Sequence, residues 1–358
     1  MTKDELFAIK IKEPDMSVYA LAKENFDSLA KPIDGFGYME DIICRIASVR
    51  GQDCDISKKA LVVMCADNGV VEEGVSQTDR AVTAKVAALL GQGKSTVGIM
   101  CSGYGITIIP VDVGVDTDDP IAGVIDKRIS RGTENITKTA AMTEEECLDA
   151  IIAGIDIAKD SAKKGIGILA TGEMGIGNTT TSTALFCALT GRNVTDVAGR
   201  GAGLSDVGLS KKINAIEDAL LLHGLGVMTP TPLKTFEALC AVGGLDIAAL
   251  AGVYIGAAIH KIPVVIDGAI SAVAALTASY IVPGCEDYMI ASHKGRERIT
   301  GEALDILGLR AVIDADMALG EGTGAVMLFP MIDMVMNVFR NGTRFSDTDI
   351  MQYERFDG

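Results

Sequence analysis

Nearly uninterrupted apolar runs recur along the chain. Each run is followed by a loop rich in glycine, aspartate or serine and then by a stretch with helical periodicity. The runs are ALVVMC (60–65), ITIIPV (106–111), IGILA (166–170), PVVI (263–266) and YMIA (288–291). Strands buried on both faces read as continuous apolar runs, and their alternation with helices favours parallel pairing. The pattern therefore predicts an α/β fold, with a parallel Rossmann-like sheet covered by helices.

The connecting helices carry their own start and stop signals. One is expected near 80–90, after the first run. Another should begin at Thr143, because Glu146 lies three residues later and the pair forms a capping box. The apolar periodicity then continues to Gly165, a typical helix stop.

The two ends of the chain follow a different pattern. Residues 17–32 and 38–51 are two amphipathic segments without a strand, and 324–342 is a further apolar helical segment. These terminal helices are expected to form a smaller helical subdomain. The predicted division is an N-terminal helical part (1–55), an α/β catalytic domain (56–325) and a C-terminal helix and tail that pack with the small domain (326–358).

Composition excludes several classes of function. The 358 residues are 48% hydrophobic, enough for a sizeable core, and the net charge of −16 argues against nucleic-acid binding. The eight cysteines are scattered without a CxxC pair, as expected for buried free thiols in a reducing compartment. The first residues lack the apolar core of a signal peptide, and no run of about 18 apolar residues suits a membrane span. A soluble, cytoplasmic protein is predicted.

Polar residues follow the predicted strands directly. In open parallel sheets, ligands bind beyond the carboxyl ends of the strands, so these side chains are expected to converge on one cleft. They are Asp67, Asp112, Glu173, Asp267 and the pair Ser292–His293.

Three glycine-rich turns are the strongest chemical signals. In ATGEMGIGNTT (170–180) a strand gives way to a helix, and Gly175, Gly177, Asn178 and Thr179 are expected to offer backbone N–H groups to a phosphate. A second turn, GRGAGL, supplies Gly201 and is followed by Lys212. The first turn also carries a carboxylate, Glu173, which would repel an anion unless it has a separate role. The third, ALGEGTGA, carries a single carboxylate, Glu321, for which a structural and a catalytic role are equally plausible from spacing alone.

Other motifs are incomplete. GQGKST (91–96) has Ala88 where a phosphate loop needs glycine, which favours a helix end and a turn, and no strand is followed by GxGxxG. His293 and Glu297 lie four apart in an expected helix, a spacing that can chelate a metal, but with no further ligand nearby a supporting or capping role is favoured. His223 and His260 adjoin apolar helical stretches and are expected to be structural. The glycine-rich turns and isolated glutamates suit an enzyme that transfers a group from a phosphorylated small molecule, with a glutamate accepting or donating a proton.

Eight motifs in order resemble the nicotinate-nucleotide–dimethylbenzimidazole phosphoribosyltransferase (CobT) family. They are LAKPIDGFGYMED, CADNGVVEEGV, VDVGVD, GEMGIGNTT, AVGGLDIAALAG, DGAISAVAAL, SHKGRE and LGEGTGA, and they span about residues 20–335. The resemblance implies a parallel α/β domain plus a small helical domain, a homodimer, and no metal or other cofactor. The implied reaction moves phosphoribose from nicotinate mononucleotide to a benzimidazole, giving α-ribazole 5′-phosphate and nicotinate in cobamide lower-ligand assembly.

The resemblance also assigns roles. Glu321 matches the general base, Glu173 the second functional carboxylate, and Lys212 a phosphate-contacting lysine. Together with the residues of the glycine-rich turns, the expected substrate-binding positions are Asp67, Thr78, Val86, Asp267 and Ser292.

Departures from the family pattern bear on the accepted base. The family usually has His at Asn68, and commonly Ser at Gly295 and Arg at Ala318; its KPPGSLG reads KPIDGFG here. Val86 stands where the well-studied type has glutamine, so the base pocket is expected to be permissive. Two alternatives stay open: a homologue specialised for phenolic or purine acceptors, and a non-catalytic regulatory paralogue.

Overall fold

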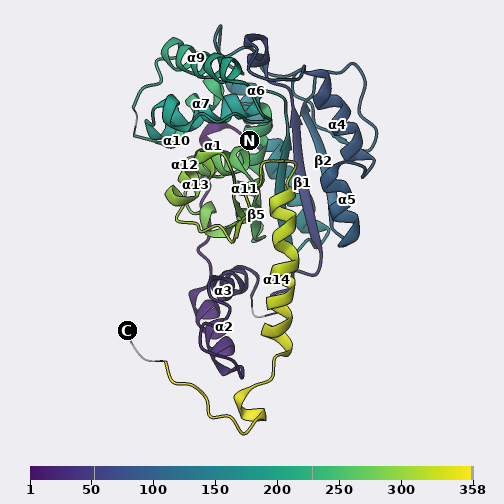
Figure 1. Cartoon of the computed structure of the whole chain (residues 1–358), viewed down its shortest axis with the longest axis vertical. Coiled ribbons are helices and arrows are strands. Elements are labelled where there is room, and N and C mark those ends of the chain that lie inside the picture. Colours follow the sequence, from purple (N-terminus) through teal and green to yellow (C-terminus); the bar gives the residue numbers. More distant parts are fainter. Residues whose placement is uncertain (52, 228, 356–358) are drawn as a thin grey trace.

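A computed structural model describes residues 1–51, 53–227 and 229–355, and its centre is a six-stranded sheet in the order β3-β2-β1-β4-β5-β6 (Figure 1). Every neighbouring pair of these strands is parallel. The strands are β1 (Lys59–Ala66), β2 (Thr107–Gly114), β3 (Ile125–Asp126), β4 (Ile168–Met174), β5 (Val264–Ile266) and β6 (Met289–Ala291). All five apolar runs form strands, which confirms the predicted fold class; the short edge strand β3 had no such signal.

Helices connect and cover these strands. Their bounds are α1 Lys3–Phe7, α2 Met16–Ser28, α3 Tyr38–Arg50, α4 Ala81–Gly91, α5 Thr96–Gly103, α6 Glu144–Lys163, α7 Asn178–Thr190, α8 Val194–Val197, α9 Asp206–Leu222, α10 Pro232–Val242, α11 Leu245–Ile259, α12 Ala269–Ile281, α13 Arg298–Ile306 and α14 Thr323–Asn341. Short 3-10 turns lie at Gly69–Glu73, Cys285–Tyr288 and Phe345–Asp347. The capping box at Thr143 and Glu146 is present at the start of α6.

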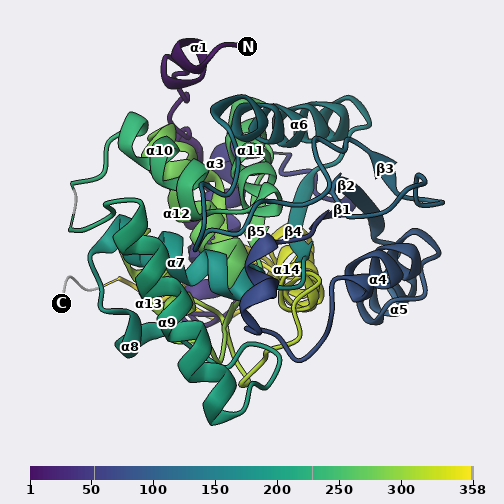
Figure 2. The ribbon, with the colours of Figure 1, turned by 90° about the horizontal axis from the view of Figure 1, so that it is seen from above.

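The sheet separates two hydrophobic cores. Alternate residues of β1 point to opposite faces, so Val62 and Met64 belong to one core while Leu61 and Val63 belong to the other. The first core includes residues of α6, α7, α11 and α12, and the second includes residues of α3, α5 and α14. Figure 2 shows α6 and α11 together, and α14 end-on beside β4.

Two glycines allow α6 and α11 to pack closely. A Cβ atom on Gly154 of α6 would lie 1.9 Å from the carbonyl oxygen of Ala249, and one on Gly252 of α11 would lie 2.0 Å from that of Ile151. Neither contact is sterically possible, so the two backbones touch only because both positions lack a side chain.

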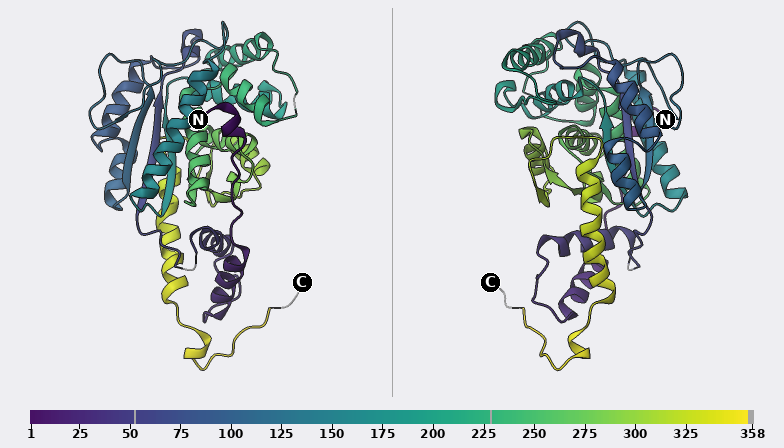
Figure 3. Two further views of the ribbon diagram at one scale, coloured as in Figure 1. Left: turned by 180° about the vertical axis from the view of Figure 1, so that it is seen from behind. Right: turned by 45° about the vertical axis from the view of Figure 1, so that its right-hand side comes forward.

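The small helical part contains α2, α3 and the distal end of α14, which extends beyond the sheet in both views of Figure 3. Phe26 of α2 and Phe339 of α14 pack with ring centroids 5.0 Å apart and ring planes tilted by 52°. Among the described residues, α14 alone is long and apolar enough to cross a membrane, and half of its apolar stretch is buried inside the protein. The predicted boundary at 325/326 falls inside this helix.

Arg344 and Arg355, beyond the end of α14, bind to α2 and the loop that follows it. Arg344 donates to Ser28 and Asn25, and Arg355 forms ion pairs with Asp27 and Asp34. Asp34 belongs to the KPIDGFG stretch and has a φ of 54°.

Two local expectations need correction, and a third is confirmed. Residues 293–297 were expected in a helix, but His293–Lys294 form β7, which pairs in parallel with β8 (Ile313–Asp314), and α13 begins only at Arg298. The N-terminal part is not purely part of the small bundle, because Phe7 packs on Phe236 of α10. GQGKST is the end of α4, a turn and the start of α5, as favoured over a phosphate loop.

Candidate active site

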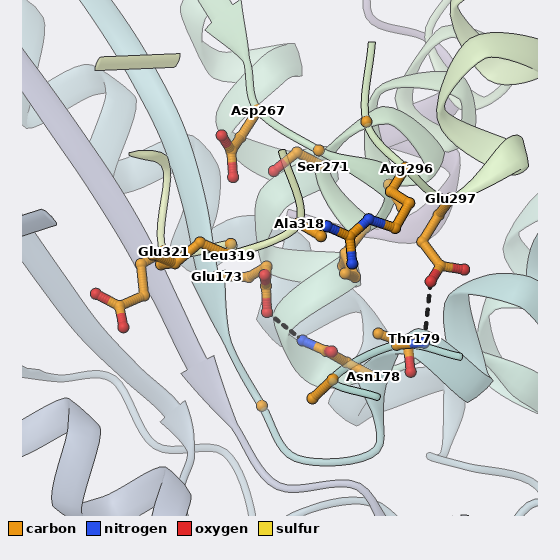
Figure 4. Close-up of a pocket in the computed structure, with 18 of the residues that line it drawn as sticks. Glu173, Asn178, Thr179, Asp267, Ser271, Arg296, Glu297, Ala318, Leu319 and Glu321 are labelled. Atoms are coloured by element: carbon orange, nitrogen blue, oxygen red, sulfur yellow. Dashed lines mark hydrogen bonds between the residues drawn. The ribbon is translucent and has the colours of Figure 1, made fainter. Parts of the chain in front are cut away.

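A pocket of about 240 Å³ lies at the carboxyl ends of β4, β5 and β6. The strand order reverses between β1 and β4, and in sheets of this kind ligands bind at that reversal. Several expected residues line the pocket: Glu173, Gly175, Gly177, Asn178, Thr179, Gly201, Asp267, His293 and Glu321. Figure 4 shows most of them around one opening.

The turn between β4 and α7 has the expected shape, but the side chain of Asn178 binds two carboxyl groups of the protein, as described below. The helix starts after Gly177, whose φ is 95°, and no side chain caps it. A Cβ on Gly175 would lie 2.4 Å from the backbone oxygen of Ala66, so only glycine fits there. The backbone of 175–179 therefore approaches the pocket directly, at the positive end of a helix dipole.

Asn178 instead bridges two buried carboxylates. Its Nδ2 donates to Oε2 of Glu173 and, at 2.9 Å, to Oδ2 of Asp246 at the start of α11 (Figure 4 shows the first bond). Burial raises the pKa of Glu173 to about 8 and that of Asp246 to about 6. Glu173 is therefore mostly protonated at neutral pH, which would remove the repulsion expected between this carboxyl group and an anion at the start of α7.

Lys212 lies behind the same turn. Its Nζ is fully buried and donates to Oγ1 of Thr179 at 3.0 Å and to the backbone oxygen of Gly199 at 3.1 Å. Burial lowers the pKa of this amine to about 8. Lys212 does not line the pocket. Its hydrogen-bond partner Thr179 does, so the amine lies directly behind the pocket wall.

The loop after β7 braces the second glycine-rich turn. Gly201 N–H donates to Oε1 of Glu297 at 2.9 Å, and a Cβ on Gly201 would lie 2.9 Å from Oγ1 of Thr179. Glu297 thus holds 199–203 against the start of α7. Since His293 is buried against Ser292 and Glu297 faces Gly201, the two do not form the metal pair that their spacing allowed.

Glu321 sits on a strained turn. Gly320, Glu321 and Gly322 have φ values of 85°, 59° and 88°, and such a run is costly for the residue that is not glycine. A side chain on Gly172 of β4 would collide with the Glu321 backbone, at 2.5 Å from its carbonyl carbon. The carboxylate points away from Glu173 in Figure 4, and its Oε2 lies 3.4 Å from the N–H of Val97 at the start of α5.

Asp267 holds this turn in place. Its two oxygens accept the N–H groups of Gly322 at 3.1 Å, Gly324 at 2.8 Å and Ala325 at 3.1 Å. Burial raises the pKa of Asp267, and these bonds favour its ionised form. Asp267 was expected to bind substrate; it lines the pocket, and the bonds that it makes also fix the start of α14.

The remaining expected residues lie outside the pocket lining. Asp67 is buried and its Oδ2 accepts the Asp116 N–H at 2.9 Å. Ser292 is buried, with its hydroxyl donating to the Ile266 oxygen at 2.6 Å. Thr78 is exposed, although Ser76 and Gln77 line the pocket, and Val86 is half-buried on α4 against the second core. Convergence after the strands therefore holds for Glu173, Asp267 and His293, whereas Asp112 pairs with Arg128.

The departures from the family pattern can now be placed. Asn68 accepts a hydrogen bond from Thr181 at 3.2 Å and supports the start of α7 from behind. Gly295 and Ala318 both line the pocket. In Figure 4 the guanidinium of Arg296 lies beside Ala318.

Sequence reasoning missed four residues of this region: Asp246, Ser271, Arg296 and Thr300. Asp246 had a usable signal, since it is a lone carboxylate opening a wholly apolar helix. Arg296 and Thr300 lie in and after SHKGRE, which was interpreted as a helix, so their direction could not be inferred. Ser271 is one polar residue in an apolar segment and gave no signal.

Comparisons with known proteins agree with the family resemblance of the sequence motifs. A family profile described as "Phosphoribosyltransferase" matches residues 11–350. Nicotinate-nucleotide–dimethylbenzimidazole phosphoribosyltransferases from Acetivibrio thermocellus and Ruminiclostridium cellulolyticum are each 40% identical, over 93% and 96% of this chain and 94% and 97% of theirs. The crystal structure of CobT from Thermus thermophilus superposes with a TM-score of 0.86 at 33% identity, covering 94% of this chain and all of that one.

Proposed function

The chain belongs to the nicotinate-nucleotide–dimethylbenzimidazole phosphoribosyltransferase family, and on that premise we propose how its residues carry out the transfer. The enzyme moves phosphoribose from nicotinate mononucleotide to 5,6-dimethylbenzimidazole, in the assembly of the cobamide lower ligand. The observation that carries the mechanism is one pocket with an anion seat at the start of α7 and two differently placed glutamates.

The 5′-phosphate binds at the start of α7. The backbone N–H groups of Gly175, Gly177 and Thr179 and the helix dipole favour an anion there, whereas those of Ile176 and Asn178 already donate to Oγ1 of Thr83 and to the Gly175 oxygen. The buried ammonium group of Lys212, which donates to Thr179, adds a positive charge behind this turn. A bound phosphate stabilises the protonated amine, so the lysine is charged in the complex although its pKa is lowered in the free protein. Gly201 closes the seat from the facing turn.

Glu321 acts as the general base. One nitrogen of the benzimidazole attacks C1′ through its lone pair, the bond from C1′ to the pyridinium nitrogen breaks, and nicotinate leaves with both electrons of that bond. The configuration inverts from β to α. The N–H on the second azole nitrogen becomes acidic as positive charge develops, and Glu321 takes that proton. The hydrogen bonds from the turn to Asp267 keep Glu321 in place for this step.

Glu173 acts as a neutral carboxyl group. With a pKa of about 8 it carries a proton at neutral pH, so it does not repel the nearby phosphate. Asn178 already donates to Oε2 of Glu173, which leaves its own O–H to donate to a ribose hydroxyl.

The acceptor base binds on the side of Glu321 that faces α4 and α5. Glu321 points away from Glu173 in Figure 4, and its oxygen lies near the N–H of Val97. Val86 of α4 does not line the pocket, but on the family resemblance we expect it to contact the base, and apolar contacts discriminate weakly between acceptors of similar shape. We expect 5,6-dimethylbenzimidazole and simpler benzimidazoles to be accepted, with adenine poorer because its amine would be buried without a partner.

The working unit is a homodimer in the cytoplasm. Met327, Met331 and Met334 form an exposed apolar stripe on α14, with 43%, 37% and 69% of their surfaces exposed. A second copy is the expected partner, and Met334→Lys should lower the mass measured by light scattering. All eight cysteines of the described chain are buried free thiols, which suits a reducing compartment.

The test of the function is a product assay. Purified enzyme is given nicotinate mononucleotide with benzimidazoles, phenols and adenine competing in one tube, and nicotinate release and each nucleotide product are quantified. Predominant benzimidazole products support the proposal. Predominant phenolic or purine products would favour a specialised homologue, and no nicotinate release with any base would favour a non-catalytic paralogue.

A further inference from the structure

A second helix N-terminus opens onto the pocket. Residues 268–271, the N-cap and first turn of α12, line it, as do 175–179 before and within α7. Helix α12 runs for 13 residues, and no side chain caps its start. The substrate of the proposed reaction also has two anionic groups, the 5′-phosphate and the carboxylate of the pyridine ring. The 5′-phosphate is assigned above to the start of α7, so the carboxylate needs a separate binding site.

Two buried hydroxyls beside this helix have no hydrogen-bond partner. Oγ of Ser271 and Oγ1 of Thr300 are unpaired in the described part of the chain, yet the two residues are only 1% and 0% exposed and both line the pocket. A Cβ on Gly295 would lie 2.9 Å from Oγ1 of Thr300 and would crowd it. Buried donors without acceptors are unfavourable, so this wall is suited to a ligand that supplies oxygen atoms.

Arg296 supplies the charge. Of the two arginines that line the pocket, Arg200 is paired with Asp206, whereas Arg296 meets no carboxylate in the described residues and donates only to the Asp316 backbone oxygen at 3.4 Å. In the view of Figure 4 its guanidinium points into the pocket beside Ala318, with Ser271 on one side and Asn178 on the other. An arginine so placed suits a planar carboxylate, to which it can donate two parallel hydrogen bonds.

We propose that Arg296, with the hydroxyls of Ser271 and Thr300, binds the pyridine carboxylate and thereby selects nicotinate mononucleotide over nicotinamide mononucleotide. The proposal rests on the proposed function. It assigns the two anions of one substrate to two helix starts: phosphate at α7 with Lys212, and carboxylate at α12 with Arg296. Nicotinamide presents an uncharged amide at the same position and loses the charge-assisted bonds.

The test compares the two nucleotides on matched variants. We expect Arg296→Gln to lower kcat/KM for nicotinate mononucleotide by about 10- to 10²-fold and to leave that for nicotinamide mononucleotide within about 2-fold, a loss typical of one charged hydrogen bond. Ser271→Ala should lower the ratio of kcat/KM for nicotinate mononucleotide to that for nicotinamide mononucleotide in the same direction, but by a smaller factor. Arg298→Gln, on a neighbouring exposed arginine that contacts only the Asp196 backbone oxygen, should leave it unchanged. In the Arg296→Gln background, Ala318→Arg should restore part of the preference.

Calorimetry with nicotinate and with inorganic phosphate as separate probes completes the test. Arg296→Gln should weaken nicotinate binding by about the same 10- to 10²-fold and preserve phosphate binding. An equal fall in kcat/KM for both nucleotides, or a loss of phosphate binding, would show that Arg296 contacts the phosphate and would overturn the proposal. So would a wild-type enzyme that uses both nucleotides equally. Absence of transfer from either nucleotide in the wild type, by contrast, is failure of the proposed function.

Discussion

Gly172 and Glu321 are in contact through their backbones. A Cβ atom on Gly172 would lie 2.5 Å from both the carbonyl carbon and the carbonyl oxygen of Glu321. Strand β4, which ends near Glu173, therefore passes the turn that carries Glu321 only because residue 172 has no side chain. This contact fixes the spacing between the two glutamates of the pocket.

Adding one methyl group at this contact should misplace the base. We expect Gly172→Ala to lower kcat by about 10²-fold, because displacements of about 1 Å in a catalytic group have effects of that size. The matched control is Gly103→Ala at the end of α5, where a Cβ meets nothing within 4 Å. Steady-state kinetics of both variants decide it, and normal turnover by Gly172→Ala would mean that the turn can move without cost.

Proton acceptance by Glu321 can be removed without changing its shape. Glu321→Gln should reduce kcat by about 10²-fold or more, with little change in nucleotide affinity measured by calorimetry. Glu145→Gln, at an exposed carboxylate of α6, serves as the control for loss of one charge. Near-normal kcat in Glu321→Gln would remove this residue from the role of base.

Nucleotide binding should depend on the protonation of Lys212. Burial lowers the pKa of this amine to about 8, so its charge is lost at a pH where ordinary lysines keep theirs. The KM for nicotinate mononucleotide should rise between pH 7.5 and pH 9.5 in the wild type. Lys212→Met should have a high KM that varies little with pH, and Lys211→Met, at the exposed neighbouring residue, should behave as wild type. A wild-type KM independent of pH in this range contradicts the assignment.

Glu173 should make stability depend on pH. Its pKa is about 8 in the folded protein and near 4.5 in the unfolded chain, so the folded state binds more protons between these values. The free energy of unfolding therefore receives its full contribution from Glu173 below pH 4.5 and loses it as pH rises towards 8, by about 1.4 kcal/mol per unit at most. Glu173→Gln lacks this titration.

Chemical denaturation at pH 5, 6, 7 and 8 measures the effect. The stability of Glu173→Gln relative to wild type should increase steadily across the series, while that of Glu145→Gln should stay constant. Because Asn178 joins Asp246 to Glu173, the series is repeated in an Asp246→Asn background, which removes the titration of Asp246 from the comparison. A constant difference between Glu173→Gln and wild type would show that Glu173 is ionised throughout.

The sequence by itself determined the sheet and the three glycine-rich turns. A strand buried on both faces must be continuously apolar, so the five runs could be found by inspection and did form β1, β2, β4, β5 and β6. The turns were visible because close backbone approach requires glycine, as at Gly175 beside the Ala66 oxygen. The family motifs added the role of Glu321, which spacing alone had left open.

The tertiary structure decided which polar groups face the ligand. Asp67 and Asp112 were expected in the cleft, yet Oδ2 of Asp67 accepts the Asp116 N–H, Oδ2 of Asp112 pairs with Arg128, and neither residue lines the pocket. Asp267 does line the pocket, while its oxygens accept N–H groups at the start of α14. Local sequence cannot reveal this, because each partner comes from a distant segment. Residues 293–294 likewise became a strand only through pairing with 313–314.

The same holds for groups whose chemistry depends on burial. Asp246 lies 68 residues from Asn178, and only the fold brings the first turns of α11 and α7 together, with Nδ2 of Asn178 and Oδ2 of Asp246 2.9 Å apart. Arg296 is one of many charged residues in the sequence; what distinguishes it is that the fold places it in the lining of a pocket, without a carboxylate partner among the described residues. A pKa or an unpaired charge is a property of the surroundings, and the surroundings exist only once the chain is folded.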